Sequence, residues 1–210
     1  MRKIILFELS IICLLNAGCS DNSEASTPST SSTMTISDST MVMSEVNAQE
    51  LTLIHLSCLS RLDLECNDSI NEGGGVLFAP YTSFDNKSAQ RLSFQEILNL
   101  HVRDTLLIWG EFDGSGEPIA MTAQRYFQRF VNDVDYLDSL VEINSGVLPL
   151  RGNSSSKLEE LFPEGEFVEF YSPPRNPELM GLDWRSLIFV FEQIENQLRL
   201  VALVHNEWTI

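Results

Sequence analysis

A histidine and a glutamate stand two residues apart near the end of the chain, at His205 and Glu207. Residues two apart on a β-strand point to the same face, so these two side chains would lie together. A neighbouring carboxylate makes an imidazole more basic, and imidazole titrates near neutral pH, so the pair would suit proton transfer. Asp183 and Asp135 are the carboxylates that we expect nearby, and the catalytic candidates are His205, Glu207 and Asp183.

The alternative for His205 is a structural role. It would then be a histidine that is hydrogen-bonded at the end of a sheet, with Trp208 packed for stability, and the sequence favours this role. A general base at this position would need its ring to face a cavity, with a carboxylate within about 3.2 Å. The two hypotheses therefore differ in the burial that they predict for one side chain.

Three tryptophans are candidates for lining a binding pocket: Trp109, Trp184 and Trp208. Tryptophan has a large apolar face and a single hydrogen-bond donor, which suits contact with a small molecule. Asp135 completes the ligand-binding candidates. The alternative, which the sequence favours, is that all three tryptophans belong to the core.

We expect no metal, no cofactor and no nucleic-acid partner. His55, His101 and His205 lack the paired spacing of a zinc site. The glycines at 73–75 lack the Lys-Ser or Lys-Thr ending of a phosphate-binding loop. The chain has 30 acidic and 13 basic residues, a formal net charge of −17, whereas nucleic acids favour clustered cations.

Helices are expected in the first part of the folded region. Asn47 and Glu50 resemble an N-terminal cap pair, and the apolar spacing after them predicts a helix over residues 48–62. Further helices are predicted after three other capping residues: Ser93, paired with Glu96; Thr122, with an apolar stripe that reaches Leu137; and Ser156, paired with Glu159 and followed by Pro163.

Strands are expected mainly in the last third of the chain. They are predicted at 76–79, 141–147, 167–171, 187–192 and 198–209, with Glu195 and Asn196 at a hairpin tip. Both faces of the strand at 187–192 are apolar, so helices must cover at least one of them. In the last strand, strict alternation puts Leu198, Leu200, Ala202 and Val204 on one face and Arg199, Val201, Leu203, His205 and Glu207 on the other.

Helices followed by strands indicate a segregated α+β fold, with N-terminal helices packed on a curved antiparallel sheet. This order resembles the cone-shaped fold shared by nuclear transport factor 2 and the polyketide cyclase SnoaL. In that superfamily the sheet wraps around a cavity that the helices close, many members bind small molecules, and only some are enzymes. The resemblance implies a pocket lined here by Trp184, Trp208 and His205.

The N-terminus has the layout of an export signal. Two cations precede an apolar run over residues 4–15, and small residues stand directly before Cys19. The run is too short to span a bilayer as a helix of about 20 residues. The segment resembles the lipobox of bacterial lipoproteins, which implies a signal peptide over 1–18 and lipidation of Cys19 with fatty acids such as palmitate. An ordinary signal peptide cut near Gly18 is the alternative.

A stalk is expected between this signal and the folded region. Residues 20–45 include nine Ser and five Thr. The segment therefore has too few apolar groups to offset the entropy cost of ordering the chain. We therefore expect a lipidated cysteine and flexible stalk over 19–45, then a single α+β domain over 46–210. Ser20 resembles the residue that permits transfer to the outer membrane, so the expected location is the bacterial cell envelope, at the outer membrane if the envelope has two.

Cys58 and Cys66 form a candidate disulfide, because an exported protein meets an oxidising compartment. Residues eight apart in a continuous helix lie about 12 Å apart along its axis. A disulfide needs a Cα separation below about 7 Å. Bonding would therefore require the helix to break near Leu62 or Asp63, and the pairing stays open.

Three motifs resemble a family of exported bacterial proteins that brings no established activity. They are Trp-Gly-Glu-Phe-Asp-Gly-Ser-Gly-Glu-Pro-Ile at 109–119, Gly-Leu-Asp-Trp-Arg-Ser-Leu at 181–187 and His-Asn-Glu-Trp-Thr-Ile at 205–210. Together these observations predict a lipid-anchored envelope protein that binds a small molecule or an envelope protein. The alternative is a hydrolase or isomerase that uses His205 as a general base.

Overall fold

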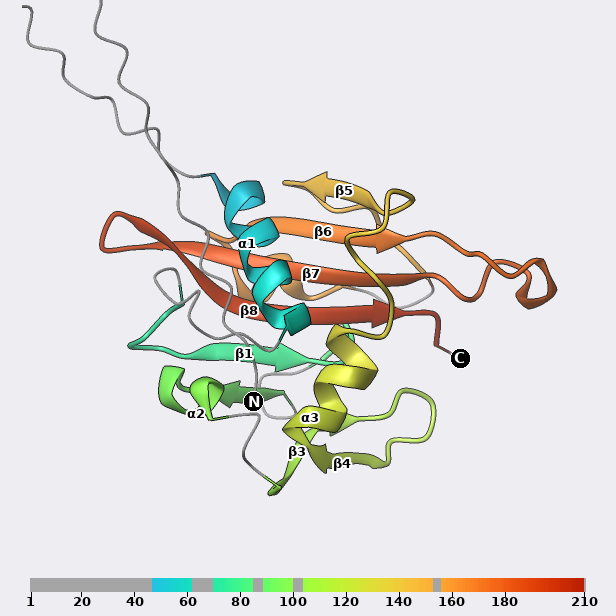
Figure 1. Ribbon diagram of the computed structural model, residues 1–210, viewed down its shortest axis with the longest axis horizontal. Coiled ribbons are helices and arrows are strands. Elements are labelled where there is room, and N and C mark those ends of the chain that lie inside the picture. Colours follow the sequence, from blue (N-terminus) through green and yellow to red (C-terminus); the bar gives the residue numbers. More distant parts are fainter. Residues whose placement is uncertain (1–46, 62–69, 85–88, 100–103, 153–155, 210) are drawn as a thin grey trace, which may run out of the picture. The chain divides into compact units, whose positions relative to one another are not determined.

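The computed structural model describes residues 47–61, 70–84, 89–99, 104–152 and 156–209. Its main sheet has six strands: β1 Val76–Ala79, β2 Gln90–Leu92, β5 Glu142–Ser145, β6 Glu166–Ser172, β7 Arg185–Ile194 and β8 Gln197–Glu207 (Figure 1). They lie in the order β2-β1-β8-β7-β6-β5. Neighbours are antiparallel except for β1 and β8, which are parallel. With few helices beside this sheet, the fold is a mixed α+β one.

The hairpin of β7 and β8 is the longest strand pair of the sheet. Its turn residues Glu195 and Asn196 both have positive φ, 53° and 62°, as type I′ hairpin turns require. The predicted hairpin tip is confirmed. The predicted faces of β7 are also confirmed: Leu187, Phe189 and Phe191 belong to one core cluster, and Ile188 and Val190 belong to the other.

The predicted faces of β8 are right from Ala202 onwards and wrong before it, because the strand contains a β-bulge. Val190 pairs with Ala202 but the next residue, Phe191, pairs with Leu200, which leaves Val201 as an extra residue. An extra residue interrupts the alternation of side chains across a strand. Leu200 therefore shares a face with Leu203 rather than with Ala202 and Val204.

The helices are α1 Ala48–Arg61, α2 Phe94–Leu98, α3 Ala123–Tyr126 and α4 Leu158–Leu161. Ser93 and Glu96 form the predicted capping box at α2, and the Thr122 hydroxyl accepts from the Arg125 N–H at the start of α3. The chain continues from α3 as a π-helical segment, Phe127–Val131, and then leaves the helix. The predicted helix up to Leu137 is therefore too long, and Leu137 is exposed.

A second, two-stranded sheet was not predicted. It consists of β3 Leu106–Glu111 and β4 Pro118–Thr122. The two strands are antiparallel, and their register shifts between Ile108 and Glu111. The turn between the two strands includes positive-φ glycines at 114 and 116. Glycine adopts this backbone region without steric cost, so the motif at 109–119 is the hairpin itself.

Each face of the main sheet has its own core. On the first face, α1 and α3 lie across the sheet (Figure 1), and Leu56, Tyr126, Phe130, Phe170 and Phe189 are among its buried residues. On the second face, α4 supplies Leu158, followed by Phe162, against residues such as Phe167, Ile188 and Val204. The expectation that helices cover at least one apolar face of β7 is confirmed.

All described residues belong to one compact unit, Ser44–Ile210. Within the described ranges, no helix is both long and apolar enough to cross a membrane. The predicted signal over 1–18, Cys19, the stalk and Cys66 lie outside these ranges, as does the side chain of Cys58. The anchor and the disulfide therefore stay predictions.

Candidate functional site

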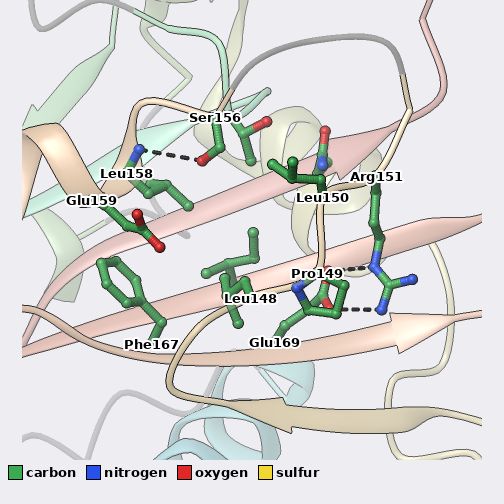
Figure 2. A pocket seen from close by; sticks show the side chains of 12 residues that line it. Leu148, Pro149, Leu150, Arg151, Ser156, Leu158, Glu159, Phe167 and Glu169 are labelled. Atoms are coloured by element: carbon green, nitrogen blue, oxygen red, sulfur yellow. Dashed lines mark hydrogen bonds and ion pairs between the residues drawn. The ribbon is translucent and has the colours of Figure 1, made fainter.

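A cleft opens on the second face of the sheet, between residues 148–151 and α4 (Figure 2). Its volume is about 90 Å³. Apolar side chains line one part of it, including Leu148, Leu158, Phe167 and Ile188. The rest of the lining is polar, and three of the polar residues, Thr82, Glu169 and Asn206, are buried. Buried polar groups cost free energy unless they are hydrogen-bonded, so their partners decide what the cleft can do.

An ion pair between Arg151 and Glu169 closes one end of the cleft (Figure 2). Arg151 Nε donates to Glu169 Oε1 and Arg151 Nη2 donates to Oε2, both at 2.9 Å. Asn144 Nδ2 adds a third bond to Oε2 at 3.0 Å, and the guanidinium lies 3.4 Å from the ring centre of Tyr171. The Glu169 side chain is 2% exposed, so its charge is almost completely withdrawn from water and depends on these donors.

Glu169 lies in β6 between Phe167 and Tyr171, which are two residues away on either side. Alternation puts all three on the second face. Sequence reasoning missed Glu169 and Arg151. A charged residue in the middle of an otherwise apolar strand was the available signal, because such a residue needs a buried partner.

Two other polar side chains of the cleft lack partners. Thr82 is 4% exposed and Asn206 is 6% exposed, and among the described residues neither side chain makes a hydrogen bond. Ser186, the register partner of Asn206 on β7, is fully buried and its Oγ also has no partner. An unmade hydrogen bond at a buried group costs about 1–3 kcal/mol. The floor of the cleft therefore holds unused donors and acceptors.

The candidate catalytic histidine lies on the opposite face of the sheet. The His205 ring is held between two oxygen atoms: Pro80 O, 3.0 Å from Nδ1, and Asp133 Oδ2, 3.1 Å from Nε2. Its edge meets the ring of Phe130 at 5.4 Å between centres, and none of its side chain is exposed. A neutral imidazole has a single N–H, so both bonds form together only when each nitrogen carries a proton.

Asp133 connects this histidine to a network of charged side chains. Its Oδ2 also lies 3.2 Å from Arg185 Nε, and its Oδ1 accepts from the Tyr136 hydroxyl at 3.0 Å. Burial opposes ionisation of Asp133, but the hydrogen bonds from His205 and Tyr136 and the charge of Arg185 lower its pKa overall. Burial and the Asp133 carboxylate raise the pKa of Tyr136, so its hydroxyl stays a donor.

Glu207 completes the network but does not bond to His205. It pairs with Arg129 from the π-helical segment and, at 3.1 Å, with Arg185 Nε from β7. Every charged group of the cluster thus has an opposite partner, and no described part of the cleft reaches His205. Of the two conditions for a general base, the carboxylate is present as Asp133 and the cavity is missing. The geometry supports the structural role.

The predicted carboxylates Asp183 and Asp135 lie in turns. Asp183 Oδ2 accepts from the backbone N–H groups of Arg175 and Asn176, both at 2.9 Å, and these bonds lower the pKa of Asp183. Asp135 is exposed and accepts from the Leu137 N–H at 3.0 Å. The structure therefore does not join either of them to His205, and Asp133 takes that place.

The three tryptophans do not line the cleft. Trp109 is fully buried, stacks on Tyr126 at 3.9 Å and donates from Nε1 to Met121 O. Trp184 is buried and Trp208 half-buried, and both lie next to Gly152, where an added Cβ would be 3.4 Å from Trp184 and 3.9 Å from Trp208. Trp109 is a core residue, whereas the other two flank the chain beside Arg151.

In the described ranges, no three His, Cys, Asp or Glu residues are grouped so that they could hold a metal ion. No protein-family model, no curated protein and no solved structure matches the chain. The feature of the molecule that bears on function is therefore the contrast between a fully paired charge network on one face of the sheet and a cleft with unpaired polar side chains on the other.

Proposed function

We propose that the chain is a lipid-anchored protein of the bacterial cell envelope whose α+β domain binds a small molecule in the cleft on the second face of the sheet. The observation that carries the proposal is the floor of this cleft, where Thr82 and Asn206 are buried without side-chain partners among the described residues. Such groups are typical of a site that is completed by a ligand. We propose binding rather than catalysis, because among the described residues of the cleft no hydroxyl is hydrogen-bonded to a base.

Ligand screening tests the binding proposal. Two neighbouring glutamates of α4 provide a matched pair of variants, since Glu159 lines the cleft and Glu160 does not, while both are exposed. A compound that raises the melting temperature of the wild type should lose at least about tenfold in affinity in Glu159→Trp, which fills the mouth of the cleft, and bind Glu160→Trp normally. Equal binding by both variants would place the ligand elsewhere.

Mass spectrometry of the mature N-terminus tests the anchor. The proposal expects Cys19 as the first residue, carrying acyl chains, and Cys19→Ala should abolish the lipid and release the protein from the membrane fraction. Ser20→Ala is the matched control and should keep the acyl chains. An intact chain with Met1 present, found in the cytosol, would overturn this part of the proposal.

We also propose that the domain is a variant of the cone-shaped fold of nuclear transport factor 2 and SnoaL. Helices α1 and α3 on one face of a mostly antiparallel sheet, with a long terminal hairpin, support this assignment. The space between helices and sheet is filled by aromatic side chains such as Trp109, Tyr126 and Phe130. The proposed ligand site is therefore on the outer face. An experimental structure whose strands pair in another order than β2-β1-β8-β7-β6-β5 would contradict the assignment.

A further inference from the structure

The free hydrogen-bonding groups of the cleft indicate what kind of ligand it takes. Asn206 is 6% exposed and lines the cleft with a carboxamide, which presents one acceptor oxygen and one donor nitrogen side by side. Thr82 is 4% exposed and adds a hydroxyl that can donate or accept. Ser186 Oγ, next to Asn206 in the register, is a further buried atom without a partner. A ligand that satisfies Asn206 must itself offer both a donor and an acceptor.

The charges of the cleft argue against an ionic ligand group. Arg151 and Glu169 satisfy each other through two bonds of 2.9 Å, so neither offers an unpaired charge to a ligand. The remaining charged residue of the lining, Glu159, is exposed. An ion at the buried floor would lose its hydration and meet no free opposite charge, which is costly. The floor therefore favours an uncharged group.

The size and the walls of the cleft set a further limit. The cleft is partly open to solvent and has a volume of about 90 Å³, so it admits a small ligand group. Leu148, Phe167 and Ile188 provide an apolar wall for a methyl or methylene group. A small amide group with one alkyl substituent fits these conditions.

We propose, building on the cleft as the binding site, that the ligand presents a neutral primary amide group, in which one N–H lies on the same side as the C=O. Its C=O accepts from the Asn206 NH₂, its N–H donates to the Asn206 carbonyl oxygen, and the Thr82 hydroxyl lies on the same floor. The alkyl part of the group packs against the apolar wall.

Three small probes test this proposal by NMR titration of the full-length chain: acetamide, acetate and methylammonium. Acetamide should shift the side-chain NH₂ resonances of Asn206 at millimolar concentration, with an affinity at least about tenfold above that of either ion. Tighter binding of an ion in the cleft would overturn the neutral-amide assignment and keep the cleft as a site. Failure of all three probes would overturn the assignment, while the Glu159→Trp screen tests the cleft independently of ligand class.

Two variants identify the recognising groups. Asn206→Asp should weaken acetamide binding at least about tenfold and shift the preference towards methylammonium, whereas Asn196→Asp, the same change at the exposed hairpin tip, should do neither. Because Asn206→Asp buries a charge and can unfold the protein, Thr82→Val provides a second test with unchanged side-chain shape. It should weaken binding about fivefold. Unchanged affinity in Thr82→Val, or in a folded Asn206→Asp, would overturn the proposal.

Discussion

Three consecutive residues at the end of β8, 205–207, alternate between the two faces of the sheet. Their side chains differ in whether the protein provides them with hydrogen-bond partners. On the helix-covered face, His205 and Glu207 are both bonded, to Pro80, Asp133, Arg129 and Arg185. On the other face, Asn206 between them is equally buried and its side chain has no described partner. Polar character and burial are therefore the same at the two sites. What differs is whether the protein itself completes the hydrogen bonds.

The comparison separates residues that hold the fold from residues that are free to recognise something else. The network around Asp133 joins β7, β8, the segment after α3 and Pro80, the residue after β1, and every described charge in it is paired. The cleft keeps one complete ion pair and leaves the side chains of Thr82 and Asn206 without a described partner. Satisfied buried networks add rigidity, whereas unsatisfied groups cost stability unless a ligand binds.

The largest expected effect comes from removing Asp133. Asp133→Ala leaves His205, Tyr136 and Arg185 without their shared acceptor and should lower the free energy of unfolding by about 3–5 kcal/mol. Asp135→Ala, which removes one exposed turn hydrogen bond, should cost about 1 kcal/mol or less. Urea unfolding measures both. Equal costs would show that the network does not hold this face.

The next effect concerns the two kinds of ion pair. Arg151→Met leaves the buried Glu169 carboxylate with Asn144 as its main donor and should cost about 3 kcal/mol. Arg175→Met breaks an exposed pair with Asp138 and should change the free energy of unfolding far less, because solvent screens both charges. Thermal and urea unfolding give both values. A cost below about 1 kcal/mol for Arg151→Met would mean that the ion pair does not organise the cleft.

Acid should loosen the helix-covered face before it affects the cleft. Burial lowers the pKa of His55, on α1, from 6.5 to about 4. The unfolded chain therefore takes up a proton first, and the stability that His55 contributes is complete above pH 6.5 and is lost as the pH falls towards about 4. The expected loss is about 2 kcal/mol between pH 7 and pH 5.

His55→Leu provides the control for this pH effect. The free energy of unfolding, measured by urea at each pH, should lose most of its dependence on pH between 6.5 and 4.5 in the variant. A wild type whose stability is flat across this range would contradict the burial of a neutral His55.

The smallest effects test single hydroxyls. Thr82→Val removes a buried hydroxyl without a described partner and should leave the free energy of unfolding unchanged or raise it by up to about 1 kcal/mol. Thr52→Val removes a buried hydroxyl that donates to Ala48 O at 2.7 Å and should lower it by about 1 kcal/mol. The difference in sign is the result that matters. A loss of stability in Thr82→Val would mean that this hydroxyl is satisfied in the folded protein.

Several elements of the fold could be predicted because their signals are local. The capping box of Ser93 and Glu96 spans four residues, and the hairpin tip depends on two residues that tolerate positive φ. Alternation in β7 identified both of its faces. The end of the third helix was predicted too late, because the apolar stripe continued beyond Val131 while the backbone left the helix through a π-helical turn.

The candidate site was harder to predict because its contacts join distant parts of the chain. His205 was singled out correctly as a polar residue at a sheet end, but its partner is Asp133, 72 residues away, rather than Glu207 or Asp183. Arg151 and Glu169 are 18 residues apart and meet only because the segment before α4 folds back over β6. The spacing of residues in the chain contains no signal for such pairs.

The sequence by itself determined the α+β class, the paired terminal strands and the polar residues at their end, since propensity, capping and turn chemistry act over a few neighbouring residues. Tertiary structure alone decided on which face of the sheet each polar residue lies and which groups it contacts there. The bulge at Val201 reset the alternation of β8, and the return of distant loops supplied partners to His205 and Glu207 and, among the described residues, none to the Asn206 side chain. These outcomes depend on strand register and loop packing, which are set by the whole chain at once.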